Sequence, residues 1–163
     1  QGLREMKSYR AFHPDANSTL RVTYGKVDGY IPRDATRYLP MTTLEGVIEK
    51  HDPDHKDFVL PSKLIQLYEE KDYGMYVNED GKLPVCFIAS NHTTGGNSGS
   101  PVINADGHLI GLNFDRSWES TMSDYNYDAQ ICRNISVDIR YVLFIIDKFS
   151  WAGHLLEEMT LVQ

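Results

Sequence analysis

The sequence lacks a long hydrophobic run and is poor in positive charge. Its longest apolar stretch is residues 141–146, far below the roughly 20 residues that span a bilayer, so we expect no transmembrane segment. Lys and Arg number 16 against 23 Asp and Glu, a net charge of −7. Because phosphate binding needs clustered Lys and Arg, this balance argues against a nucleic-acid partner. The net charge does not reveal the substrate's charge, since one basic residue can dominate a local pocket.

Cysteine is also scarce. Cys86 and Cys132 are the two in the chain, they form no CxxC pair, and no His follows at metal-ligand spacing. We therefore expect no zinc site, no other metal and no cofactor. The spacing favours two buried free thiols and leaves a disulfide open in an oxidising compartment. The chain begins at Gln1 without an initiator Met, so we expect a processed chain or part of a longer protein.

The overall composition is that of an ordinary globular protein. The 163 residues are 41% hydrophobic and 24% charged, which predicts one domain over residues 1–163 with a real core. Residues 1–18 are polar and predict an irregular lead-in. Residues 19–30 alternate apolar and polar side chains, which predicts one strand or two strands meeting near Gly25. Residues 31–41 contain two prolines and predict a loop.

Two short helices are predicted in the first half and several strands in the second. Thr42 and Glu45 fit a capping box for a helix that ends near Lys50, and apolar residues at helical spacing predict a second helix over 61–72. Short apolar runs then predict strands at 84–90, 100–104, 108–114 and 131–137, with a hairpin at 105–107 and a polar loop at 115–130. Asp138 is expected to cap a C-terminal helical segment over 138–161. The pattern as a whole predicts a mostly β, barrel-like fold.

The segment that carries chemistry is residues 94–102, TGGNSGSPV. Glycines on both sides of Asn97 and Ser98 allow positive φ angles and leave the main chain open to a ligand. Successive N–H groups in such a turn can converge on one negative charge. The amides of Gly96 and Ser98 are therefore candidate donors of an oxyanion hole. A Gly/Ser-rich loop between strands accounts for the same letters without any catalysis.

The letters GNSGSP at residues 96–101 resemble the Gly-Asp-Ser-Gly-Gly-Pro signature of chymotrypsin-like serine peptidases. This resemblance implies that Ser98 is the nucleophile and that the chain forms the second, C-terminal barrel of a trypsin-like double β-barrel, with short inserted helices and a C-terminal helix. Three further stretches, 87–102, 111–116 and 137–148, look like the bacterial dipeptidyl-peptidase family that includes dipeptidyl-peptidases 7 and 11. Residues 14–35 resemble the same family. The likeness covers most of the chain.

Within that family the residue 18 positions after the nucleophile tunes the S1 pocket, which binds P1, the residue before the scissile bond. Here it is Arg116, similar to the dipeptidyl-peptidase 11 branch, which prefers Asp or Glu. A guanidinium matches a carboxylate bidentately. The resemblance also implies that Asp115 holds the substrate's free amino group. Without the family likeness, Arg116 is a solvated loop residue and Asp115 its ion-pair partner.

A serine nucleophile needs a general base and a group that orients it. In the resembled family the catalytic His and Asp precede the stretch that this chain covers. His92 lies close to Ser98 in sequence, and we interpret it as structural; the other histidines match no triad order. We therefore expect this chain alone to be inactive, with the N-terminal barrel of the same protein as its missing partner. An unpaired barrel exposes an apolar face, which predicts association such as a homodimer. The resemblance implies a peptide substrate and a periplasmic or cell-surface location.

Two other functions stay open. A non-catalytic module that binds peptides without cleaving them agrees with the missing His and Asp, although the intact turn around Ser98 argues against it for a longer parent. A glutamyl endopeptidase of the same clan shares the serine motif, but the inserted helices and the pair Asp115 and Arg116 favour the dipeptidyl-peptidase.

Overall fold

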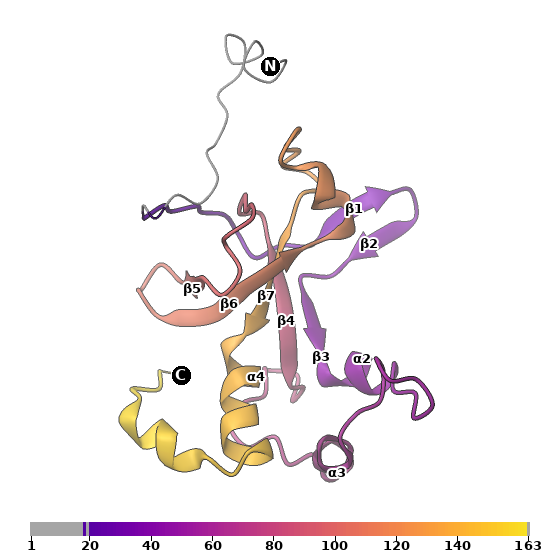
Figure 1. The fold of residues 1–163 in the computed structure, drawn as a ribbon, viewed down its shortest axis with the longest axis vertical. Helices are drawn as coiled ribbons and strands as arrows, with labels where there is room; N and C mark the ends of the chain where they lie inside the picture. Colours follow the sequence, from indigo (N-terminus) through magenta and orange to yellow (C-terminus); the bar gives the residue numbers. More distant parts are fainter. Residues whose placement is uncertain (1–17, 19, 163) are drawn as a thin grey trace.

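A twisted antiparallel sheet of five strands organises the molecule. The computed structural model describes residue 18 and residues 20–162, and the strand order is β3-β4-β7-β6-β5. Figure 1 shows β6 running obliquely across β7 and β4. The strands are β3 (Met41–Thr43), β4 (Pro84–Ala89), β5 (Pro101–Ile103), β6 (Leu109–Arg116) and β7 (Asn134–Asp138). The coarse prediction of a β-sheet accompanied by a few short helices is confirmed.

The centre of the sheet is the pair β4 and β7. Cys86 lies opposite Val137 in this pair, and β6 continues the sheet on the other side of β7, with Asn113 opposite Ser136. No side chain of β4 or β7 is exposed, which explains why these two strands contain a single charged residue, Asp138. The four strands predicted in the second half are confirmed to within a few residues. So is the hairpin between β5 and β6, in which Gly107 adopts a φ of 86°.

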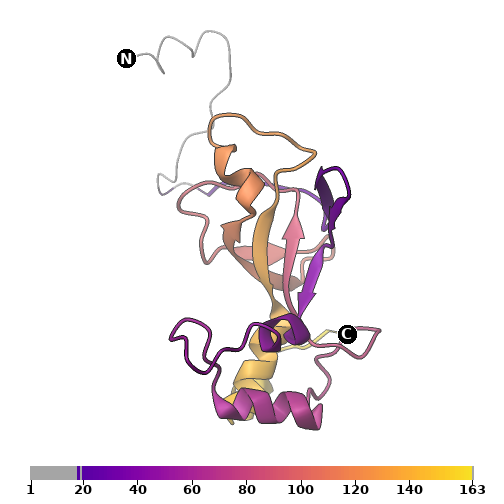
Figure 2. The ribbon, with the colours of Figure 1, turned by 90° about the vertical axis from the view of Figure 1, so that its right-hand side faces the viewer.

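Three short helices lie at one end of the sheet, as Figure 2 shows. They are α2 (Leu44–Ile48), α3 (Ser62–Glu70) and α4 (Ile139–Phe144). Their apolar faces enclose what we call the helix-backed core, in which Leu44, Leu83 and Phe144 are 0% exposed. The other buried members of this core are Leu64, Leu67, Tyr73, Tyr76 and Val85. The predicted helix over 61–72 is confirmed as α3, whose buried residues Leu64 and Leu67 share one face.

The C-terminal segment begins as predicted and then changes its helix type. The Asp138 carboxylate accepts a hydrogen bond from the Arg140 N–H at 2.9 Å, which caps α4. The regular helix ends at Phe144 and continues as a wider π-turn, η3 (Ile145–Phe149). A 3-10 helix, η4 (Gly153–Glu158), follows after Trp151, whose φ of 55° breaks the chain direction.

The first third of the chain differs from the prediction. Residues 20–29 form no strand: Val27 makes an isolated bridge to Ala89, and Leu20, Val22 and Tyr24 are 95%, 85% and 90% exposed. The alternating pattern marks one apolar face, but a strand also needs a neighbour, and the described chain supplies one only near Val27. The predicted lead-in lies outside the described residues except for position 18.

The predicted loop at 31–41 is a hairpin. It consists of β1 (Tyr30–Arg33) and β2 (Thr36–Tyr38), with Ala35 at a φ of 60° in the turn. Pro32 misled the prediction, because a proline is tolerated on the outer side of a two-stranded hairpin. The helix predicted after Thr42 exists as α2, but its N-cap is Thr43 and no side chain caps it, so the capping box itself is wrong.

Both cysteines are free thiols, Cys132 buried and Cys86 half-buried. The prediction of free thiols is confirmed, although only Cys132 is fully buried. Burial raises the pKa of the Cys86 thiol, because the thiolate is poorly solvated there. Among the described residues, no helix has the length and apolar character needed to cross a membrane.

Candidate active site

The turn from Thr94 to Pro101 is shaped by hydrogen bonds to its own asparagine. The Thr94 N–H donates to Asn97 Oδ1 at 3.0 Å, and the Asn97 N–H donates to the Thr94 carbonyl at 3.2 Å. Gly96 and Gly99 adopt φ angles of 95° and 81°. Any other residue would be strained at these two positions. The glycines on either side of Ser98 therefore serve a sharp bend, as the sequence predicts.

Ser98 lies exposed at the tip of this bend. Its Oγ donates a hydrogen bond to the Phe114 carbonyl of β6 at 3.2 Å. Within the described residues this is the one hydrogen bond of the hydroxyl, and none joins it to a histidine or a carboxylate. The hydroxyl thus faces the surface beside β6, without a general base in the part of the chain that the structure describes.

The amides on either side of Ser98 fall into two groups. The N–H groups of Asn97, Gly99 and Ser100 donate to carbonyls of Thr94, Asn113 and Asn97. Those of Gly96 and Ser98 donate to no acceptor among residues 18 and 20–162. Both amides that the sequence nominates for an oxyanion hole are therefore available to a ligand, as is the Gly95 N–H, which also donates to no acceptor among the described residues.

Beneath the turn lies a network of buried amides that sequence reasoning missed. Asn113 of β6 is 6% exposed and Asn134 of β7 is 3% exposed. Asn113 Nδ2 donates to the Asn97 carbonyl at 3.2 Å, and Asn134 Nδ2 donates to Asn113 Oδ1 at 2.8 Å. Two asparagines inside predicted strands, at positions where apolar residues are usual, are the signal that could have found this network.

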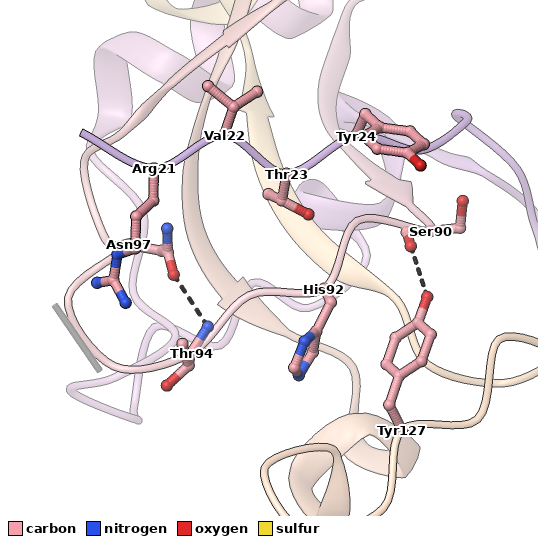
Figure 3. A pocket seen from close by; sticks show the side chains of 9 residues that line it. All are labelled: Arg21, Val22, Thr23, Tyr24, Ser90, His92, Thr94, Asn97 and Tyr127. Atoms are coloured by element: carbon pink, nitrogen blue, oxygen red, sulfur yellow. Dashed lines mark hydrogen bonds between the residues drawn. The ribbon is translucent and has the colours of Figure 1, made fainter. Parts of the chain in front are cut away.

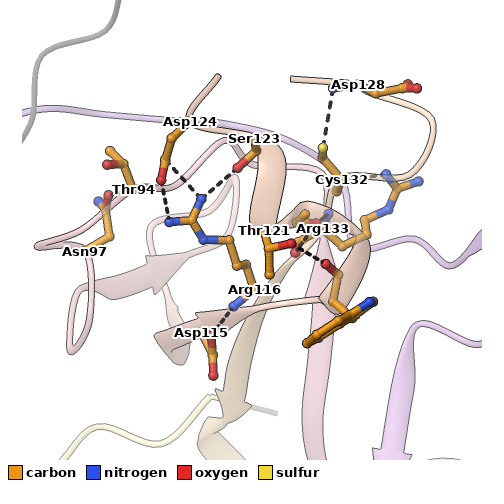
Figure 4. A network of polar contacts seen from close by, with 12 residues as sticks. Thr94, Asn97, Asp115, Arg116, Thr121, Ser123, Asp124, Asp128, Cys132 and Arg133 are labelled. Carbon is orange, nitrogen blue, oxygen red and sulfur yellow. Dashed lines mark hydrogen bonds and ion pairs between the residues drawn. The ribbon is translucent and has the colours of Figure 1, made fainter. Parts of the chain in front are cut away.

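Arg116 ends β6 and makes a bidentate ion pair that the sequence did not indicate. Its Nη1 and Nη2 each lie 3.0 Å from an oxygen of Asp124, and Nη1 also donates to Ser123 Oγ at 2.8 Å. Figure 4 shows this arrangement. The hydrogen bond to Asp124 raises the pKa of Arg116, so its charge is permanent. The proposed ion pair with Asp115 is wrong: the exposed Asp115 carboxylate accepts from the Arg116 backbone N–H at 2.8 Å instead.

A cavity of about 540 Å³ opens beside the turn (Figure 3). His92 lies in its wall with its ring 4.9 Å from that of Tyr127, and the Tyr127 hydroxyl donates to the Ser90 carbonyl at 2.7 Å. This aromatic contact agrees with a structural role for His92. The residues that line the cavity are Arg21, Val22, Thr23, Tyr24, Ser90, His92, Thr94, Asn97 and Tyr127. In the portion of the chain that the structure describes, no group of three His, Cys, Asp or Glu side chains could hold a metal ion.

An exposed serine and open backbone amides are features that acyl-transfer sites share. The model of the peptidase S46 family matches residues 1–161. The chain belongs to the peptidase S46 family.

Relatives within peptidase S46 are similar to this chain over nearly its whole length. An Asp/Glu-specific dipeptidyl-peptidase from Flavobacterium psychrophilum is 67% identical over 149 residues, 91% of this chain and 21% of the relative. Dipeptidyl-peptidase 7 from Phocaeicola vulgatus is 54% identical over 163 residues, 100% of this chain and 23% of the relative. The chain thus spans about a fifth of the length of the curated peptidase S46 relatives that it matches.

A solved structure agrees with these sequence matches. The crystal structure of Porphyromonas endodontalis DPP11 in complex with the dipeptide Arg-Asp superposes with a TM-score of 0.87 at 54% identity. The match covers 96% of this chain and 22% of that one. The twisted sheet with its few helices is therefore the fold of the corresponding part of this peptidase.

Proposed function

We propose that this chain is the C-terminal part of a serine dipeptidyl-peptidase that releases N-terminal dipeptides ending in Asp or Glu. One observation carries the proposal: the exposed hydroxyl of Ser98 lies on a bend whose Gly96 and Ser98 N–H groups donate to no acceptor within the described residues. A tetrahedral intermediate needs these elements, a nucleophile and two N–H donors beside it.

In this mechanism Ser98 Oγ attacks the carbonyl carbon of the scissile bond and gives its proton to a histidine. The carbonyl oxygen becomes an oxyanion that accepts hydrogen bonds from the two open amides. The C–N bond then breaks, the leaving amine takes the proton from the histidine, and water hydrolyses the acyl-enzyme. The hydrogen bond that Ser98 Oγ donates to the Phe114 carbonyl is lost when the histidine approaches and accepts from this hydroxyl instead. We assign this histidine and its aspartate to the sequence that precedes the chain in the parent.

Specificity follows from the two residues at the end of β6. The Arg116 guanidinium, held by Asp124 and Ser123, binds the P1 carboxylate in S1 through the N–H donors that these bonds leave over. The exposed Asp115 carboxylate holds the substrate's ammonium group. The names of two relatives support acidic specificity: one protein from Flavobacterium psychrophilum and one from Capnocytophaga gingivalis are Asp/Glu-specific dipeptidyl-peptidases. Porphyromonas endodontalis DPP11 has been crystallised with Arg-Asp and with Arg-Glu. A fixed spacing from ammonium to scissile bond accounts for release of two residues.

The proposal extends to the architecture of the parent. We assign the sheet to the second barrel of a trypsin-like double β-barrel, whose first barrel covers apolar side chains such as Leu20, Val22 and Tyr24, which are 85–95% exposed here. An isolated chain exposes this surface and is expected to associate, for example as a homodimer. The parent acts in the periplasm or on the cell surface, where peptides are available, and its mechanism uses no metal or cofactor.

The experiment compares the isolated chain with the longer protein, meaning this chain together with the upstream sequence that its relatives contain. The longer protein is expected to cleave chromogenic Leu-Asp and Leu-Glu substrates, and Ser98→Ala to lower kcat roughly a millionfold. The isolated chain is expected to be inactive. Turnover by the isolated chain that Ser98→Ala abolishes would refute the assignment of the base to upstream sequence.

Two further variants and substrates separate the alternatives. Arg116→Gly is expected to shift the preference from acidic towards apolar P1, and unchanged acidic preference would refute the S1 role of Arg116. N-acetylated substrates should resist cleavage, whereas a glutamyl endopeptidase would accept them. A peptide-binding module is favoured by the absence of any histidine bonded to Ser98 in the described chain. It predicts dipeptide binding without turnover in the longer protein.

A further inference from the structure

Asn113 is a polar side chain in the interior of a sheet. It lies near the middle of β6, opposite Ser136 of β7, and is 6% exposed. A buried amide costs stability unless its donor and acceptor are both satisfied. The partners that satisfy Asn113 therefore indicate what the residue is for.

Three of these partners belong to the turn that carries Ser98. The Gly99 N–H donates to the Asn113 carbonyl at 2.7 Å, and the Asn113 N–H donates to the Ser100 carbonyl at 2.9 Å. On the other side of the serine, Asn113 Nδ2 donates to the Asn97 carbonyl at 3.2 Å. The main chain at position 113, which any residue would supply, thus holds the chain after Ser98, and the Asn113 side chain holds the carbonyl before it.

The hydrogen bond from Asn113 Nδ2 to the Asn97 carbonyl affects the direction of the Ser98 N–H. The carbonyl of Asn97 and the N–H of Ser98 belong to one peptide unit, which is planar and trans, so the two groups point in opposite directions. Because Asn113 Nδ2 and the Ser100 N–H both donate to the Asn97 carbonyl, the Ser98 N–H must point away from these two donors. That direction leaves it without an acceptor in the described chain, as observed.

We propose that Asn113 is a positioning residue that orients the Ser98 N–H as an oxyanion donor. The inference rests on the proposed peptidase function and assigns to Asn113 no contact with the substrate. It acts through the Asn97–Ser98 peptide plane, whose carbonyl accepts from Asn113 Nδ2 at 3.2 Å and from the Ser100 N–H at 3.0 Å. Asn113 therefore adds the contact from the sheet to one made within the turn.

The role requires asparagine, because the side chain must donate at one atom and accept at the other. Asn134 Nδ2 donates to Asn113 Oδ1 at 2.8 Å, and this contact turns Asn113 Nδ2 towards Asn97. Asn134 is itself 3% exposed on β7, so its position is set by the sheet. Aspartate at position 113 would still accept from Asn134 Nδ2. Its other carboxylate oxygen, however, would face the Asn97 carbonyl oxygen, and two acceptors cannot form a hydrogen bond.

The test is Asn113→Asp in the longer protein, with Asn104→Asp as the matched control. Asn104 lies in the hairpin between β5 and β6, where its Oδ1 only accepts, from the N–H groups of Asp106 and His108, so aspartate serves equally well there. Loss of a whole oxyanion donor lowers kcat about 10²–10³-fold. We expect Asn113→Asp to lower kcat roughly 10–100-fold and to leave KM nearly unchanged, while Asn104→Asp changes neither.

A second readout separates positioning from general damage to the fold. A dipeptide aldehyde forms a tetrahedral adduct on Ser98 and needs the oxyanion donors, whereas the product dipeptide does not. Asn113→Asp should weaken binding of the aldehyde by the same factor by which it lowers kcat, and should leave the affinity for the product dipeptide unchanged. Equal losses for both ligands would overturn the proposal. If Asn113→Asp fails to fold, Asn113→Ala replaces it under the same criteria, since alanine removes the Nδ2 donor without placing a second oxygen against the Asn97 carbonyl.

The outcomes also distinguish this inference from the proposed function. Unchanged kcat in a folded Asn113 variant, with activity abolished by Ser98→Ala, would overturn the role of Asn113 and leave the peptidase assignment standing. Persisting turnover in Ser98→Ala would overturn the peptidase assignment itself, whatever Asn113→Asp does.

Discussion

The two ends of the sheet are buried by different means. At one end, α2, α3 and α4 enclose apolar side chains such as Leu44, Leu83 and Phe144, all 0% exposed. At the other end, beneath the turn of Ser98, the buried residues include Asn113, Asn134 and Ser136, which are 6%, 3% and 0% exposed. The first end is held by hydrophobic contacts between these side chains. The second is held by hydrogen bonds between amides, from Asn134 Nδ2 to Asn113 Oδ1 and from Asn113 Nδ2 to the Asn97 carbonyl.

This difference has a physical reason. Hydrophobic burial is non-directional and scales with area, so it stabilises a fold without specifying the orientation of any one group. Hydrogen bonds are directional and are costly to leave unmade when buried. A turn that must present one hydroxyl and two amides in a defined geometry needs the second kind of support. The helix-backed core then supplies the stability that the polar end does not.

The largest expected effect tests the apolar end. Phe144→Ala should lower the free energy of unfolding by about 3–5 kcal/mol, because it removes a fully buried ring and leaves a cavity. Urea denaturation of the chain measures this loss. Trp118→Ala is the control, since Trp118 is 84% exposed and its removal should cost little. A loss below about 1 kcal/mol for Phe144→Ala would show that the core repacks freely and that hydrophobic contacts do not hold this end of the sheet.

A smaller effect tests the polar end. Arg133 is 6% exposed, and its guanidinium donates to the carbonyls of Asp28, Gly29, Ala129 and Cys132 at 2.8–3.1 Å. Arg133→Lys should lower the free energy of unfolding by about 2 kcal/mol, because one ammonium cannot satisfy all four carbonyls.

The matched control for Arg133 is Arg33→Lys in the β1–β2 hairpin, where the arginine is exposed and bonds Thr36. Thermal or urea denaturation compares the two variants. Equal effects would mean that the directional contacts of Arg133 contribute nothing, and that the polar end is held by burial alone.

The smallest effect concerns a hydroxyl within the apolar end. Burial, together with the hydrogen bond that the Tyr76 hydroxyl donates to Asp147 at 3.0 Å, raises the pKa of Tyr76 to about 12. The folded pKa lies above the unfolded value near 10, so this group's contribution is complete below about pH 10 and is lost as the pH rises through 12. Tyr76→Phe should therefore flatten the fall in stability between pH 10 and 12 by about 1 kcal/mol.

Urea denaturation at a series of alkaline pH values measures that slope. Tyr24→Phe is the control, since the Tyr24 side chain is 90% exposed and its removal should leave the slope unchanged. An identical slope in Tyr76→Phe and in the unsubstituted chain would contradict a role for this hydroxyl in the pH dependence.

The elements with strong local signals were predictable. The hairpin at Gly107, the cap at Asp138 and the apolar face of α3 each depend on contacts within a few residues, so the sequence alone indicates them. The segment over residues 19–30 was not predictable, because an alternating pattern states which face is apolar but not whether a neighbouring strand exists. Pro32 concealed β1 for a related reason: whether a proline is tolerated depends on the pairing of its strand.

The candidate site divides in the same way. Gly96, Ser98 and Gly99 are adjacent in the chain, and their residue types alone determine a sharp, open bend with a hydroxyl at its tip. The partners of that bend, Asn113 and Asp124, come from elements that only the folded sheet brings into contact. Hydrogen bonds between distant segments depend on strand order and register, which no local pattern encodes. Local backbone chemistry therefore decided the turn, and tertiary structure decided what orients it.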